Sequence, residues 1–219
     1  STVVGTDPFN PAGPVHAFQS ASNAQAKVRG GHPDWLLFKC GDVWYENVAA
    51  MSGRSPGERA VMAAYGAGTA RPLFKTGASA GVRTGSAGWS NSVMLSLQFK
   101  AHTRDPWSGE YASSNGSVGL SCVTAAGRPM EHILIEDCGF SFYSLNLSLQ
   151  SAGPMSDVFV RRCQILDAYS VNSHSQGFYA HNAAVTLEET VFDHNGWLVQ
   201  GSNNIQAFGG ATMFNHNTY

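Results

Sequence analysis

The chain has few charged side chains, and their balance excludes one class of partner. Asp, Glu, Lys and Arg make up 13% of the 219 residues, against about 25% in a typical soluble domain. The formal net charge is −2, so there is no basic field to attract a polyanion, and we predict no nucleic-acid partner. No apolar run approaches the roughly 18 residues of a membrane-spanning helix. We therefore predict no membrane span.

Metal-binding motifs are also missing. The four cysteines are Cys40, Cys122, Cys138 and Cys163. None of them forms a C-x-x-C pair, which argues against a zinc site. No RTX-type nonapeptide is present, although calcium bound by Asp and Asn oxygens remains open. We predict no firm cofactor.

Helical patterning is confined to one place near the start. Pro8, Pro11 and Pro14 disfavour helix in the first residues. Val15–Arg29 is rich in Ala and Gln with apolar residues near one face, so we predict a helix that caps the structure that follows. We divide the chain into an extension with this capping helix (1–30) and one domain (31–219). Ser1 stands where Met would begin a gene product, so either a removed leader or a shortened chain is expected.

A repeat with a period in the twenties organises the second half of the chain. The segments HILIEDCGFS, DVFVRRCQIL, AVTLEETVFD and ATMFNHNTY align so that Cys138, Cys163, Thr190 and Asn217 share one position. Their spacings are 25, 27 and 27 residues. Each of the first three segments carries apolar residues two apart, as in Ile133 and Ile135, which is the alternation of a strand with one buried face.

A second strand is predicted inside each repeat. The segments 119–123 (GLSCV) and 146–150 (NLSLQ) lie 27 residues apart, and 175–181 (SQGFYAH) follows with its register open by about two residues. Coils of short strands joined by Gly-, Ser- and Asn-rich turns stack about 4.8 Å apart. The sequence therefore predicts an all-β parallel β-helix, or solenoid. Cys138 would stack on Cys163, a poor geometry for a disulfide, so we expect buried free thiols.

The middle of the chain contains an earlier rung and a long loop. In Trp89–Ala101 we expect Val93, Leu95, Leu97 and Phe99 to point inward. His102–Ser117 then interrupts the repeat with charged and aromatic residues. Loops projecting from a rigid scaffold often carry function. Trp107 and Tyr111 are candidates for a sugar-binding wall, while the alternative is a loop that only covers the outside of the solenoid.

Several motifs resemble those of one group of proteins. They are DWLLFKCGDVW (34–44), SGRS (52–55), VMAAYG (61–66), HSQGFY (174–179), FDHNGW (192–197) and FNHNTY (214–219). The chain resembles, over nearly its whole length, the right-handed parallel β-helix proteins that bacteria secrete, of the pectin-lyase-like superfamily. The resemblance implies a right-handed coil and a secreted, periplasmic or cell-surface location. It also implies further coils, or a C-terminal cap, beyond Tyr219.

Ionisable and polar residues gather in the last quarter of the chain, where four of the eight histidines lie. We predict catalytic roles for His174, Tyr179, His194, Asp167 and Asp193. We predict substrate-binding roles for Gln176, His181, Asn195, Trp197, Arg162, Trp107 and Tyr111. His216 and Asn217 belong to the same cluster. The alternative for any single one is a turn residue that satisfies backbone groups, but so many titratable groups in one region favour a site.

Two enzyme mechanisms fit a groove on such a solenoid. In an elimination, His194 or His174 removes a ring proton of a uronate, Tyr179 protonates the leaving oxygen, and amide or cationic groups neutralise the carboxylate. In a hydrolysis, the carboxyl groups of Asp167 and Asp193 flank the glycosidic bond. Because Asp167 lies 27 residues before His194, we expect these two residues on neighbouring coils at the same turn. The resemblance slightly favours the lyase.

Binding without catalysis is the other hypothesis. The last rung of a β-helix exposes strand edges that can pair with another chain. A fibre-forming or adhesin-like protein that self-associates through this rung is therefore an alternative. The leading prediction is a secreted carbohydrate-active protein whose partner is an extracellular polysaccharide, and its basis is analogy of fold.

Overall fold

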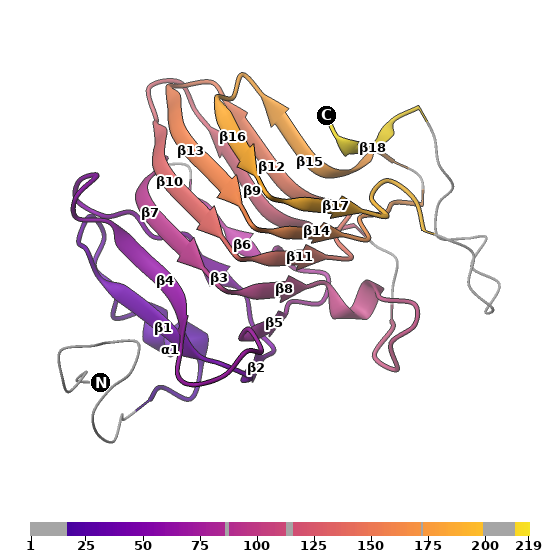
Figure 1. Cartoon of the computed structure of the whole chain (residues 1–219), viewed down its shortest axis with the longest axis horizontal. Helices are drawn as coiled ribbons and strands as arrows, with labels where there is room; N and C mark the ends of the chain where they lie inside the picture. Colours follow the sequence, from indigo (N-terminus) through magenta and orange to yellow (C-terminus); the bar gives the residue numbers. More distant parts are fainter. Residues whose placement is uncertain (1–16, 86–87, 113–115, 172, 199–212) are drawn as a thin grey trace.

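The structure is a computed structural model in which residues 17–85, 88–112, 116–171, 173–198 and 213–219 are described. Within them the chain forms three parallel sheets of six strands each (Figure 1). Sheet A contains β1 (Trp35–Lys39), β4 (Ala60–Tyr65), β7 (Trp89–Leu95), β10 (Met130–Glu136), β13 (Met155–Arg161) and β16 (Val185–Glu188). Sheet B contains β2 (Val43–Trp44), β5 (Leu73–Lys75), β8 (Gln98–Lys100), β11 (Gly139–Ser141), β14 (Gln164–Leu166) and β17 (Val191–Asp193). Sheet C contains β3 (Val48–Ala49), β6 (Val82–Arg83), β9 (Val118–Thr124), β12 (Leu145–Ser151), β15 (Ser175–His181) and β18 (Asn215–Thr218).

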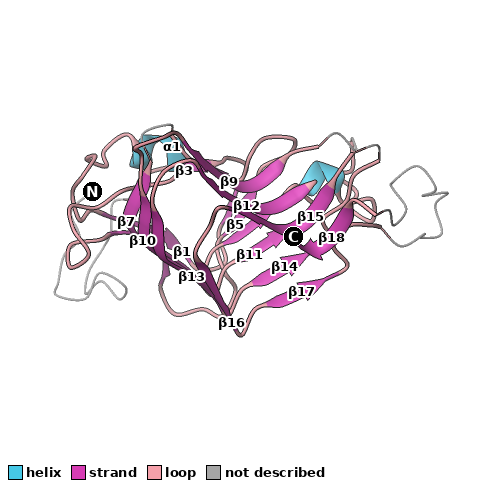
Figure 2. Cartoon of the chain, turned by 90° about the horizontal axis from the view of Figure 1, so that it is seen from above, coloured by secondary structure: helices cyan, strands magenta, loops and turns pink. Residues whose placement is uncertain are grey.

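The chain visits sheets A, B and C in turn and then begins the next coil. Each strand pairs in parallel with its counterparts on the neighbouring coils. Seen from above, the three sheets surround the interior (Figure 2). This arrangement confirms the predicted parallel β-helix. The short strands of sheet B were not recognised as a separate sheet in the sequence.

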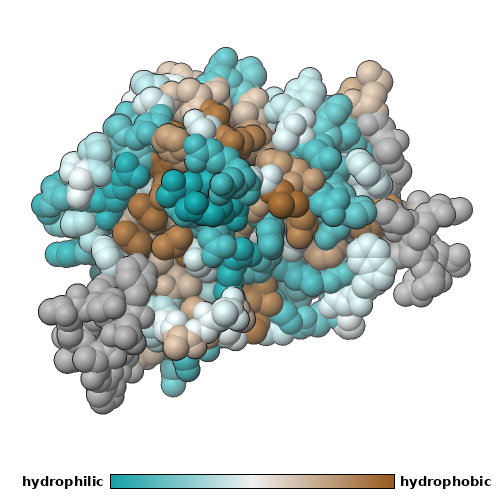
Figure 3. Space-filling view, viewed as in Figure 1, coloured by the Kyte–Doolittle hydropathy of each residue, from teal (hydrophilic) through white to brown (hydrophobic). Residues whose placement is uncertain are grey.

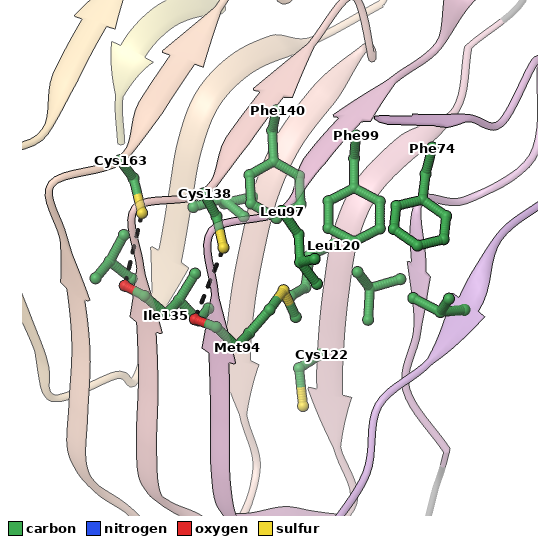
Figure 4. Packing of buried hydrophobic residues seen from close by; sticks show 14 of the residues in the cluster. Phe74, Met94, Leu97, Phe99, Leu120, Cys122, Ile135, Cys138, Phe140 and Cys163 are labelled. Carbon is green, nitrogen blue, oxygen red and sulfur yellow. Dashed lines mark hydrogen bonds between the residues drawn. The ribbon is translucent and has the colours of Figure 1, made fainter. Parts of the chain in front are cut away.

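The interior is built from ladders of like residues. The rings of Phe74, Phe99 and Phe140 stack with centroids 5.0 and 5.2 Å apart, and Figure 4 shows them side by side. Their alignment follows from the register of β5, β8 and β11. Because each coil places the same residue type over the last one, the buried apolar area forms one continuous core.

The two cysteines of the repeat occupy equivalent places in this core. Cys138 and Cys163 are buried and free. The thiol of Cys138 donates to the carbonyl oxygen of Met94 (3.7 Å), and that of Cys163 donates to the carbonyl oxygen of Ile135 (3.6 Å; Figure 4). Burial raises the pKa of the Cys163 thiol to about 11. The expectation of buried free thiols is confirmed.

One predicted rung has the wrong inward residues in part. Leu97 and Phe99 are fully buried, but Met94 is buried in place of Val93 and Leu95. Met94 pairs with Ile135, whose side chain also points inward. Ser96 has φ 57°, so the corner between β7 and β8 reverses the alternation that the prediction carried straight through.

The fourth repeat was also aligned wrongly. Thr190 does stack on Cys163, whose N–H donates to the Thr190 hydroxyl (3.4 Å). Asn217 does not continue that ladder, because β18 pairs with β15 in sheet C and not with β17. The predicted polar ladder of Asn217 above Thr190 is therefore wrong.

The helix is shorter than predicted. α1 spans Ala21–Gln25, whereas the prediction was Val15–Arg29, whose first two residues lie outside the described part. Ser20 caps it by accepting from the N–H of Asn23 (3.2 Å). The Gln25 side chain exchanges hydrogen bonds with the backbone of Ala49, which fixes α1 against the first coil. In Figure 1 α1 lies at the N-terminal end of the solenoid, where the cap was expected.

Candidate functional site

The predicted site residues separate into two surfaces. We define the sheet B stripe as the outward side chains at the carboxyl ends of the sheet B strands, with the loop after β8. Its members are Lys75, Lys100, Asp105, Trp107, Glu110, Asp167, Asp193 and His194. We define the sheet C groove as a hollow of about 500 Å³ on sheet C. Its lining is Leu145, Gln150, His174, Gln176, Tyr179, Met213, Phe214, His216 and Tyr219.

The backbone explains why the stripe projects from the scaffold. Phe142, Asp167 and His194 follow β11, β14 and β17, and all three have left-handed φ values of 65°, 55° and 49°. The register of β14 with β17 places Asp167 beside His194 on the neighbouring coil. The N–H of Asp167 donates to the carbonyl oxygen of Asp193 (3.1 Å). The predicted juxtaposition of Asp167 and His194 is confirmed.

Asp167 is the stripe residue whose protonation the fold changes most clearly. Its side chain is partly buried, and this desolvation raises the pKa of the carboxyl above its usual range. The charge of His194 acts in the opposite direction, while Asp105 and Asp193 reinforce the rise. A carboxyl group held protonated near a second carboxylate is the arrangement that acid–base catalysis uses.

Asp193 and His194 form an exposed pair at the end of the stripe. The Nδ1 atom of His194 lies 3.0 Å from an Asp193 carboxylate oxygen, and both side chains are more than half exposed. Asp193 therefore orients the imidazole that the sequence proposed as a base. The pair remains accessible to a ligand on the outside of the solenoid.

A buried arginine anchors the loop over the stripe. η1 (His102–Arg104) begins this loop, and Arg104 is fully buried. Its guanidinium donates to the carbonyl oxygens of Phe142 and Tyr169, each at 2.6 Å, and lies over the Tyr169 ring. The Tyr169 hydroxyl donates to the carbonyl oxygen of Arg104 (2.6 Å). The loop thus has a rigid base, which holds the residues after it in place.

Aromatic side chains stand beyond this anchor. Trp107 is 53% exposed, and its ring meets that of Phe142 edge-on. Its N–H donates to Asp105 (3.0 Å). Tyr111, also predicted to bind substrate, is 37% exposed near the end of the loop. Trp107 is therefore the better placed of the two for stacking on a ligand beside Asp167.

Two lysines of the stripe were missed in the sequence. Lys75 and Lys100 pair directly across β5 and β8. The Lys75 ammonium binds Glu110 (2.5 Å) and the Tyr45 hydroxyl (3.1 Å), while Lys100 binds Asp105 (2.6 Å). Their spacing of 25 residues matches the period of the repeat. Extending the repeat backward from Cys138 would have found them.

The sheet C groove is lined by aromatic and uncharged polar groups. The rings of Tyr179 and Tyr219 stack with centroids 5.6 Å apart, and the His216 ring lies 5.1 Å from that of Tyr219. His174 packs beside Phe214 (4.8 Å). β15 and β18 supply most of these residues through their parallel register. The groove therefore brings together the predicted residues His174 and Tyr179.

Gln176 and His181 also lie on β15. Gln176 is buried at the groove wall, and its amide donates to the carbonyl oxygen of Phe214 (3.0 Å). His181 is exposed at the end of the strand, beside Gln150 in the register. Gln176 lines the groove, whereas His181 is not among the lining residues.

Asn195 has a place that the prediction did not foresee. It is fully buried. Its amide donates to Ile165 (2.6 Å) and Asn217 (3.1 Å), and its carbonyl oxygen accepts from Asn146 and Ala168. These bonds hold the turn after β17 against neighbouring coils. Trp197 follows in that turn and is half-buried.

Arg162 lies away from both surfaces. It follows β13 at the corner between sheets A and B, where it forms ion pairs with Glu136 and, at 3.6 Å, with Glu189. Those carboxylates hold its charge, and the structure does not bring it near His174, Tyr179 or His194.

Neither surface offers a metal cage in the part of the chain that the structure describes. No three His, Cys, Asp or Glu side chains there could together hold a metal ion. The described helices are also too short and polar to cross a membrane. No protein-family model, curated protein or solved structure matches this chain.

Proposed function

We propose that this protein is a secreted carbohydrate-active protein that binds an extracellular polysaccharide along the sheet B stripe and hydrolyses it. The observation that carries the proposal is the partly buried Asp167, with its raised pKa, beside the exposed Asp193–His194 pair. The stripe runs from β5 to β17 across four coil spacings, roughly 19 Å, which suits a linear polymer. Most of the face that carries it is hydrophilic, with small separate apolar patches (Figure 3).

The reaction assigns a different role to each carboxyl group. Asp167 holds its proton and gives it to the glycosidic oxygen as that bond breaks. Asp193 is the ionised partner, which either activates a water molecule or attacks the sugar directly. His194 holds Asp193 in place, and Trp107 stacks on a sugar ring next to the cleaved bond. The geometry favours this hydrolysis over elimination, because both stripe lysines are already paired with carboxylates.

A reducing-end assay over a panel of polysaccharides tests the proposal. Asp167→Asn and Asp193→Asn are each expected to lower the rate on the best substrate by about 100-fold or more, the scale of lost acid–base catalysis. His181→Ala, on an exposed residue of β15, is the matched control and should retain full activity. Hydrolysis that persists in both aspartate variants would contradict these roles.

A lyase site in the sheet C groove is the second candidate. Tyr179 supplies a phenol and His174 or His216 an imidazole, which are the acid and base of an elimination. The lining has no Lys or Arg to neutralise a uronate carboxylate. New ultraviolet absorbance from an unsaturated product, lost in Tyr179→Phe, would support this candidate. Reducing ends without such absorbance would favour hydrolysis.

Self-association without catalysis is the third candidate. Among the described strands, β16, β17 and β18 end the three sheets. Leu187, Val191 and Tyr219 at this end are 39%, 54% and 67% exposed. An open edge with apolar side chains invites strand pairing with another copy. This candidate predicts an oligomer or fibre in solution.

A further inference from the structure

The charges of the sheet B stripe restrict the kind of polymer that it accepts. Its two cations are Lys75 and Lys100. The Lys75 side chain is 21% exposed and binds Glu110, and the Lys100 side chain is 27% exposed and binds Asp105. Lys100 also lies over the Phe142 ring, 5.0 Å from its centroid. Each positive charge therefore already has a carboxylate partner within the protein.

The acidic groups outnumber these cations. Asp167 and Asp193 remain after the two lysine pairs, and His194 contacts Asp193 without adding a permanent charge. An anionic ligand would bring its own carboxylate towards these groups. Two like charges 4 Å apart repel by about 4 kcal/mol near a protein surface. The stripe therefore disfavours a polyuronate.

The sheet C groove gives the same result by a different route. Its lining contains no Asp, Glu, Lys or Arg. A carboxylate bound there would lose water and gain no ion pair. A sugar hydroxyl, in contrast, can bond to Gln150, His174 and His216, and an apolar sugar face can pack on Tyr219.

We propose, on the basis of the function proposed above, that the polysaccharide is uncharged. Carboxylates suit such a ligand because Asp and Glu accept hydrogen bonds from sugar hydroxyls. Trp107 and Tyr219, at 53% and 67% exposure, offer ring surfaces to the apolar faces of neutral sugars. The substrate class is a neutral, hydroxyl-rich polymer.

Matched polymers that differ only in charge test this inference. Each neutral glucan, galactan or mannan of a panel is compared with the same polymer oxidised at C6 to the uronate, using affinity electrophoresis at low and high salt. At least one neutral polymer is expected to bind at least ten-fold more tightly than its uronate, with a smaller difference at high salt. Tighter binding of the uronates would overturn the inference but leave a polysaccharide partner. Binding to no polymer would overturn the proposed function, and the inference with it.

A variant that frees a lysine provides the second arm. Glu110→Gln removes the ion-pair partner of Lys75 while the chain keeps its length and shape. It is expected to improve relative binding of the uronate by at least three-fold. Glu131→Gln, which makes the same charge change on β10 of sheet A, should leave the ratio unchanged. Equal ratios for both variants would show that Lys75 does not face the polymer.

Discussion

Asn195 shows how one buried side chain links three coils. It bonds to Asn146 on β12, to Ile165 and Ala168 around β14, and to Asn217 on β18. Each bond satisfies a group that would otherwise be buried without a partner. The sequence suggested substrate binding for this residue, whereas its contacts are those of a structural anchor.

Asn195→Ala is expected to lower the free energy of unfolding by about 3 kcal/mol, because several buried donors and acceptors lose their partner. Urea denaturation followed by circular dichroism measures the change. Asn23→Ala, on an exposed position of α1, is the control and should change stability by less than about 0.5 kcal/mol. A loss below about 1 kcal/mol for Asn195→Ala would mean that the network is unimportant.

Asp167 makes stability depend on pH in a direction opposite to that of most carboxyl groups. Its pKa is raised by burial, so the native state binds its proton more tightly than the unfolded state does. The contribution to stability therefore falls as pH rises through the native pKa. Asp167→Asn removes this titration, and the variant should gain stability relative to the parent between about pH 4 and about pH 7. Urea midpoints measured across that range test it, and a constant difference would contradict the assignment.

At the scale of elements, close packing of strands depends on small residues at defined places. Gly119 on β9 is buried at the inner face of sheet C. A Cβ atom there would lie 2.4 Å from the carbonyl oxygen of Asn146 and 3.0 Å from ring atoms of Phe140 and Tyr143. The first contact is with backbone on the neighbouring coil, which cannot move without disturbing the ladder.

Gly119→Ala should therefore cost about 2 kcal/mol of stability through overpacking. Thermal or urea unfolding gives the value. Gly109→Ala in the loop after β8, where no atom lies within 4 Å of the added Cβ, is the matched control. An unchanged midpoint for Gly119→Ala would show that β9 and β12 can separate at no cost.

At the scale of the whole molecule, the solenoid has one axis and two ends. Coils contact mainly their neighbours, so stability accumulates along the axis. α1 covers the first coil, and β16, β17 and β18 end the described sheets. What pairs with that end decides between an enzyme acting alone and a structural assembly.

Light scattering over a range of concentrations separates these two cases. The hydrolase proposal predicts a monomer near 23.3 kDa at every concentration. A stable oligomer, or a mass that grows with concentration, would favour the assembly. Charged substitution at Val191, which is exposed on β17, should then return the protein to a monomer.

Much of the architecture could be predicted from local pattern. The alternation of Ile133 with Ile135 and the 25-residue step from Cys138 to Cys163 indicated stacked strands and buried thiols, because coil stacking repeats the same environment at a fixed period. The prediction failed where a corner interrupts the alternation, as at Ser96, whose positive φ no local pattern revealed. It failed again at Asn217, because a loop of different length moved β18 to another sheet.

The candidate site was predictable as a list of residues and not as a place. The sequence by itself determined which ionisable residues are enriched late in the chain, and the period determined that Asp167 would meet His194. Only the tertiary structure decided that His174 and Tyr179 belong to a separate groove, that Asn195 is an anchor and that Arg162 lies elsewhere. The physical reason is that coil stacking is periodic and local, whereas the length of each turn decides which sheet a side chain projects from. Turn length is set by long-range pairing that no short segment encodes.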